Sequence, residues 1–144
     1  MSWGPPTWLF LHCLAEKINP SHYLLVKDTL WGFIKELCST LPCPDCSSHA
    51  TTYLSKIPTP PSKFHLVQAL YQFHNTVNQN TNKSPFPMEG LLQYKAVPLL
   101  LAYSLYKKTL HQPYNPKLMM HKMRSKQFIF KFQTWLQQQQ LLQT

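Results

Sequence analysis

Residues 43–49 of the chain are CPDCSSH, in which Cys43 and Cys46 are separated by two residues and followed by His49. Pro44 suits the first turn of a helix, because the N–H that proline lacks would have no partner there. A thiolate at a helix N-terminus is stabilised by unpaired backbone amides and by the helix dipole. The stretch therefore predicts a helix that begins at Cys43 or Pro44 and carries a reactive dithiol able to form and break a disulfide.

The apolar residues around this stretch predict an all-α fold. They recur at spacings of three and four, and alternation with a period of two is almost absent. The expected helices cover residues 6–17, a segment capped by Ser21 that ends before Pro42, residues 43–56, a segment capped by Ser62, residues 91–108 with a bend or start at Pro98, and residues 116–143. The proline-rich segment 84–87 predicts the edge between a domain of residues 1–88 and a helical extension of residues 89–144.

Composition limits the classes of protein that the chain can belong to. Its 144 residues, 44% of them apolar, suit one compact domain. The N-terminus has no pattern of a secretory signal, and the longest apolar region, residues 96–106, is about half the length that a membrane span needs. The formal charge of +9 is compatible with a solvated helical surface, so nucleic acid is not the favoured partner. Five scattered carboxylates offer no acid–base pair for hydrolysis.

The dicysteine alone leaves a zinc site open as an alternative. Zinc sites use the same spacing of two cysteines, and Cys43, Cys46, His49 and His74 fit a Cys2His2 ligand set. Under that alternative the chain is a non-enzymatic zinc module whose basic C-terminal region binds nucleic acid.

Two further motifs favour a different chemistry. The sequence WGPPTW at residues 3–8 is followed by Leu11 and His12, and HNTVN at residues 74–78 is followed by Asn82 and Lys83. Helical geometry places Cys46 and His49 on one face, and His74 and Asn78 one turn apart. A zinc finger needs none of these tryptophans or asparagines.

Together these segments resemble the Erv/ALR family of FAD-linked sulfhydryl oxidases. The resemblance rests on the patterns G-x-x-x-W-x-x-L-H, C-x-x-C-x-x-H and H-N-x-V-N in this order, and it covers about residues 3–86. The compact form that begins with Trp-Gly-Pro is most similar to the small oxidases of large DNA viruses, which implies a viral origin. The resemblance implies a four-helix bundle around FAD, followed here by a C-terminal helical extension.

The resemblance also implies a role for each matching residue. Cys43 is expected to be the outer sulfur that a substrate thiolate attacks, and Cys46 to lie against the isoalloxazine ring. The cofactor-binding residues that it implies are Gly4, Trp8, His12, Cys46, His49, His74, Asn75, Val77, Asn78, Lys83 and Phe86. No residue is assigned to a metal.

The implied activity is the oxidation of protein dithiols to disulfides, with electrons passing through the cysteine pair and FAD to oxygen to give hydrogen peroxide. The expected substrates are viral proteins or a thioredoxin-like relay, in the host cytoplasm and the virion. The family pattern further implies a homodimer through the first two helices. For Cys13 and Cys38, two buried free thiols are favoured over a bridge or relay between them.

Overall fold

The computed structural model describes residues 3–111 and 119–144. These residues form helices and loops, with no strand among them, so the all-α prediction is confirmed. The α-helices are α1 (Gly4–Lys17), α2 (Pro20–Ser39), α3 (Pro44–Ser55), α4 (Lys63–Asn80), α5 (Leu99–Lys108) and α6 (Met119–Gln138). Two 3-10 segments, η1 (Met88–Ala96) and η3 (Leu141–Gln143), complete the described elements.

The start of α2 differs from the sequence prediction. The N-cap is Asn19, whose Oδ1 accepts the backbone N–H of Ser21 at 2.9 Å, and Pro20 is the first helical residue. The prediction that Ser21 caps this helix was wrong, because proline is well suited to the first helical position and places the cap at Asn19, two residues earlier. The predicted cap of α4 is confirmed, since Ser62 Oγ accepts the N–H of His65 at 3.3 Å.

The region after Pro87 is less continuous than expected. Residues Met88–Ala96 form a 3-10 helix, and α5 begins at Leu99, directly after Pro98. Pro98 therefore precedes a new helix and does not bend one long helix, because proline terminates an incoming helix more readily than it continues it. The predicted last helix ends at Gln138, before the left-handed Gln140, and its first expected residues, 116–118, lie outside the described residues.

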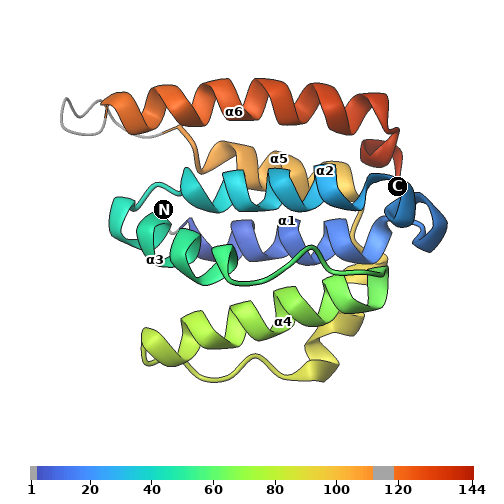
Figure 1. The fold of residues 1–144 in the computed structure, drawn as a ribbon, viewed down its shortest axis with the longest axis horizontal. Helices are drawn as coiled ribbons and strands as arrows, with labels where there is room; N and C mark the ends of the chain where they lie inside the picture. Colours follow the sequence, from blue (N-terminus) through green and yellow to red (C-terminus); the bar gives the residue numbers. More distant parts are fainter. Residues whose placement is uncertain (1–2, 112–118) are drawn as a thin grey trace.

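The α-helices lie with their long axes roughly parallel, with α6 along one edge of the molecule and α4 along the opposite edge (Figure 1). α5 packs on α1, and α6 packs on α2. Phe10 of α1 stacks on Tyr106 of α5 at 5.2 Å between ring centroids, and Phe33 of α2 stacks on Phe132 of α6 at 4.8 Å. One buried apolar cluster includes residues on both sides of position 88, where a domain edge was predicted from sequence.

The two cysteines outside the motif are buried free thiols. Cys13 lies in α1 and Cys38 in α2, both almost without solvent contact. Burial raises the pKa of Cys13 to about 11 and that of Cys38 to about 12, so both stay protonated near neutral pH. The preference for free thiols over a Cys13–Cys38 bridge is confirmed. Within the described ranges no helix is long and apolar enough to cross a membrane.

Candidate redox site

The dicysteine forms a disulfide across the start of α3. Cys43 and Cys46 are bonded through their sulfurs, and their Cα atoms are 5.2 Å apart. Cys43 is the N-cap of the helix, and its Sγ accepts the backbone N–H of Cys46 at 3.2 Å. Pro44 is the first helical residue, as the sequence predicts. Both sulfurs therefore lie where backbone amides and the positive end of the helix dipole stabilise a thiolate.

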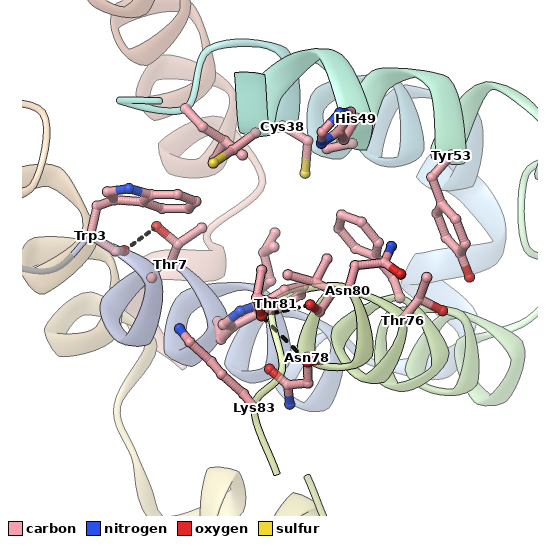
Figure 2. A pocket seen from close by; sticks show the side chains of 18 residues that line it. Trp3, Thr7, Cys38, His49, Tyr53, Thr76, Asn78, Asn80, Thr81 and Lys83 are labelled. Atoms are coloured by element: carbon pink, nitrogen blue, oxygen red, sulfur yellow. Dashed lines mark hydrogen bonds between the residues drawn. The ribbon is translucent and has the colours of Figure 1, made fainter. Parts of the chain in front are cut away.

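A cavity of about 310 Å³ lies beside this disulfide (Figure 2). Its walls come from α1, the end of α2, α3 and α4. In Figure 2, Cys38 and His49 approach the cavity from one side, while Thr76, Asn78 and Lys83 lie across from them. Cys46 belongs to the lining, whereas Cys43 does not. One sulfur of the disulfide thus faces the cavity, and its partner lies outside.

Seven of the predicted cofactor-binding residues line this cavity: Gly4, Trp8, Cys46, His49, Val77, Asn78 and Lys83. The other four, His12, His74, Asn75 and Phe86, are not part of the lining. The sequence motifs therefore mark both the surface of the cavity and the side chains packed behind it.

The residues behind the surface support Trp8. The indole ring lies nearly parallel to the His74 imidazole, with 4.1 Å between the ring centroids and 8° between the planes. His74 Nδ1 lies 2.9 Å from His12 Nε2, within hydrogen-bonding distance. Phe86 stacks on the far side of the pair, with ring centroids 4.8 Å from His74 and 5.5 Å from His12. Trp8 is thus backed by a stack of flat rings.

Both histidines of this stack are neutral near pH 7. Burial, together with the neighbouring His74, lowers the pKa of His12 to about 3. Burial, together with the positive charge of Lys83, lowers the pKa of His74 to about 4. Two neutral rings can share one N–H between Nε2 of His12 and Nδ1 of His74, whereas two protonated rings would repel each other.

Asn75 fixes the loop that follows α4. Its side-chain Nδ2 donates to the carbonyl oxygen of Phe86 at 3.1 Å, and the N–H of Phe86 donates to its Oδ1 at 2.7 Å. This pair of bonds holds Phe86 against the histidines. Asn75 therefore acts on the site through Phe86 and not by lining the cavity.

The cavity has the features that a flavin requires. Four aromatic side chains, Trp3, Trp8, Tyr53 and Phe73, contribute flat apolar surface to its walls. A Cβ added at Gly4 would meet no atom within 4 Å, so this helix start leaves open space toward the cavity. FAD contains a flat tricyclic ring that can stack between such aromatic surfaces. The polar side chains in the lining can hydrogen-bond to the polar groups of FAD.

Asn78 brings to the cavity a side-chain amide that no other group of the described residues occupies. The residue is only 8% exposed, yet its side-chain amide makes no hydrogen bond within the described part of the chain. An amide held in this way is ready to pair with the edge of a heteroaromatic ring. Lys83, which is exposed at the same cavity, supplies a positive charge for a phosphate.

Sequence reasoning missed several lining residues: Trp3, Thr7, Leu11, Cys38, Leu41, Ala50, Tyr53, Phe73, Thr76, Asn80 and Thr81. Helical periodicity could have identified Tyr53, because it lies seven residues after Cys46 and shares its face of α3. The same spacing rule links Thr7 to Trp3 and Leu11 on α1. Nothing in the sequence indicates Cys38 or Leu41, which reach the cavity only because α2 ends there.

The zinc alternative finds no support in the geometry. In residues 3–111 and 119–144, no group of three His, Cys, Asp or Glu side chains is arranged to hold a metal ion. Two of the four proposed ligands, Cys43 and Cys46, are joined in a disulfide, and His74 is paired with His12.

Comparisons with known proteins identify the family of the chain. The model of the Erv1/Alr family matches residues 5–96. A putative FAD-linked sulfhydryl oxidase of Invertebrate iridescent virus 3 is 29% identical over 99 residues, which are 67% of this chain and 67% of the relative. A FAD-linked sulfhydryl oxidase of African swine fever virus (isolate Pig/Kenya/KEN-50/1950) is 32% identical over 84 residues, or 58% of this chain and 71% of the relative. No solved structure matches the chain. The chain belongs to the Erv1/Alr family.

Proposed function

We propose that this chain is a FAD-linked sulfhydryl oxidase, which converts pairs of protein thiols into disulfides with oxygen as the electron acceptor. The observation that carries the proposal is that the Cys43–Cys46 disulfide lies at the boundary between the aromatic cavity and its outside. Cys46 lines an aromatic cavity that suits a flavin, while Cys43 lies outside that cavity. Family membership and the names of the viral relatives support the same activity.

The aromatic walls and Asn78 are the groups that would hold FAD. Trp3, Trp8 and Tyr53 offer flat surfaces to its ring system, Asn78 offers an unpaired amide, and Lys83 offers a positive charge. When bound, FAD supplies a two-electron acceptor that oxygen re-oxidises, with hydrogen peroxide as the product.

The protein's own part of the reaction is thiol–disulfide exchange. A substrate thiolate attacks Cys43 Sγ, the Cys43–Cys46 bond breaks, and Cys46 leaves as a thiolate. A second substrate thiolate then attacks the substrate sulfur of the mixed disulfide, and Cys43 leaves in turn. The substrate has lost two electrons and two protons and gained a disulfide, and the cysteine pair has gained the two electrons.

The geometry of α3 favours this direction of attack. Cys43 is the N-cap, outside the cavity lining, so it is the sulfur that an external thiolate meets. Cys46 lies in the first turn, where the helix dipole stabilises the negative charge that develops as it leaves. A stabilised leaving thiolate speeds the exchange.

The proposal extends to partners and place of action. Both relatives named above are viral proteins, which supports viral proteins or a thioredoxin-like relay as substrates, in the host cytoplasm and the virion. A homodimer through α1 and α2 also stays a proposal. α5 and α6 pack on these two helices, so a partner copy would have to use what they leave exposed, such as Leu25, which is 85% exposed.

The test is oxygen consumption by the purified chain with dithiothreitol and with a reduced unfolded protein. The expected result is uptake of oxygen with hydrogen peroxide formed in equal amount, and loss of both in a Cys43→Ser variant. A protein that contains flavin yet consumes no oxygen above the rate of that variant would contradict the proposed activity.

A further inference from the structure

The end of α2 leads directly into the redox disulfide, and its carbonyl groups need partners. The last carbonyl oxygens of a helix have no N–H donor inside the helix, so donors from elsewhere must bind them. Leu37 O accepts the backbone N–H and the hydroxyl of Thr40, both at 3.0 Å. The carbonyls of the C-cap Thr40 and of Leu41, which follows it, lie beyond the reach of the helix's own amides.

Two side chains of α6 bind these carbonyls. Ser125 Oγ donates to Thr40 O at 3.0 Å, and Ser125 is only 6% exposed. His121 Nε2 donates to Leu41 O, so Nε2 of this ring carries the proton. Residues 80 or more positions away in the sequence thus satisfy two consecutive carbonyls directly after α2.

The segment held in this way is part of the redox site. Cys38 and Leu41 line the same cavity as Cys46, and Cys43 follows Leu41 by two residues. Ser47 Oγ, from the first turns of α3, also donates to Leu41 O at 3.3 Å. Leu41 therefore connects α3 and α6 to the cavity. Its side chain lines the cavity, and its carbonyl oxygen accepts hydrogen bonds from one residue of α3 and one of α6.

This connection belongs to the C-terminal extension. The family model ends at residue 96, whereas His121 and Ser125 lie in α6. In Figure 1 the first turns of α6 lie at the same end of the molecule as the end of α2 and the start of α3. Farther along, Phe33 of α2 packs against Phe128 and Phe132 of α6, which fixes the helix along α2.

We propose that Ser125 and His121 are positioning residues of the redox site. They hold the connection between α2 and α3 so that Cys46 faces the cavity while Cys43 remains open to substrate thiolates. This inference rests on the proposed function and adds a role for the C-terminal extension in it. Small displacements of reacting groups have large kinetic effects, so loss of these two bonds slows the exchange even when the fold persists.

Pairs of variants with matched shape test the role. Ser125→Thr keeps the hydroxyl, and Ser125→Val places a side chain of nearly the same shape as threonine there without the hydroxyl. His121→Gln keeps a side-chain N–H donor, and His121→Leu removes it. Lys131→Gln is the control, because it breaks the 3.0 Å ion pair with Glu36, another contact between α6 and α2, on exposed side chains. All variants are measured in the full chain.

The measured quantities are kcat and KM with dithiothreitol, bound FAD per chain, and the reduction potential of the Cys43–Cys46 pair in glutathione buffers. We expect Ser125→Val and His121→Leu to lower kcat by about tenfold and to shift the potential, with FAD content unchanged. Ser125→Thr, His121→Gln and Lys131→Gln should stay near the parent protein in all three quantities.

Equal kinetics and equal potentials for Ser125→Val, His121→Leu and Lys131→Gln would overturn the positioning role. If the Ser125 variants fail to fold, the His121 pair decides, because this half-buried side chain lies nearer the surface. A parent protein without flavin or oxygen uptake would instead contradict the proposed function, so the two failures are distinguishable.

Discussion

His12 Nε2 lies 2.9 Å from His74 Nδ1, which joins α1 to α4 behind the wall of the aromatic cavity. The two residues are 62 positions apart in the sequence. Trp8 lies on His74 as the last ring before the cavity, and Phe86 closes the stack from the other side. The position of the cavity wall therefore depends on a bond between two buried imidazoles, at least one of which must be neutral to accept it.

The pair predicts that the protein loses stability in mild acid. In the unfolded chain both histidines titrate near pH 6.5, whereas in the folded chain the pKa of His12 is about 3 and that of His74 about 4. Between these values the unfolded state binds more protons, so the free energy of unfolding falls as the pH drops below 6.5. The slope approaches about 1.4 kcal/mol per pH unit for His12, and solvent screening makes the contribution of the less buried His74 smaller.

Urea unfolding of the flavin-free protein at pH 7.5, 6.0 and 5.0 measures this slope. His12→Asn should flatten the profile, and the control His65→Gln, on an exposed residue, should keep it. A parent profile that is level between pH 7.5 and 5.0 would show that the histidines do not titrate as the structure requires.

His74→Ala should weaken FAD binding and also lower stability. The substitution removes the ring on which Trp8 lies and leaves Nε2 of His12 buried without its partner, at a cost of about 1–3 kcal/mol. The checks are the flavin content after gel filtration and the midpoint of urea unfolding. His65→Ala is the matched control. Unchanged flavin content in His74→Ala would show that His74 does not contribute to FAD binding.

Substitutions of Asn78 and Asn75 by alanine should affect different properties of the protein. Asn78 has no hydrogen-bonding partner for its amide in the described part of the chain, so Asn78→Ala should lower FAD affinity while the flavin-free protein loses less than about 1 kcal/mol of stability. Asn75 holds Phe86 through two hydrogen bonds, so Asn75→Ala should destabilise the flavin-free protein by about 1–3 kcal/mol.

Titration of FAD into each flavin-free variant and urea unfolding without FAD separate the two effects. The idea fails if Asn78→Ala binds FAD as tightly as the parent, or if it is destabilised as much as Asn75→Ala.

Cys46→Ser should retain FAD and lose oxidase turnover. A serine fits the space of the thiol but can neither form nor leave a disulfide, so kcat should fall by at least about 100-fold. Cys13→Ala is the control, because Cys13 is a buried free thiol outside the cavity and should keep turnover. Substantial turnover in Cys46→Ser would reject the assigned role of this sulfur.

Much of this arrangement follows from local sequence. Cys43 and Pro44 specify the start of α3, and Ser62 specifies that of α4, because caps and first-turn prolines act through backbone atoms close by. The motif residues around Trp8, Cys46 and Asn78 mark the cavity, since helical spacing keeps each set on one face.

The remaining features depend on tertiary packing. The pairing of His12 with His74 needs α1 and α4 to lie side by side, and the bond from Ser125 to Thr40 needs α6 to lie along α2. No local pattern encodes either contact. Asn19 and Ser21 both suit an N-cap and flank the same proline, so local sequence alone does not decide which of them caps α2.

The central claim is that the sulfur of Cys46 meets a flavin in the aromatic cavity, and the visible absorption spectrum of Cys43→Ser tests it most directly. That variant leaves Cys46 as the single thiol of the pair, on the cavity side. The account predicts a yellow protein with one FAD per chain and an added long-wavelength absorption band that Cys46→Ser lacks. A colourless protein, or identical spectra for the two variants, would contradict it.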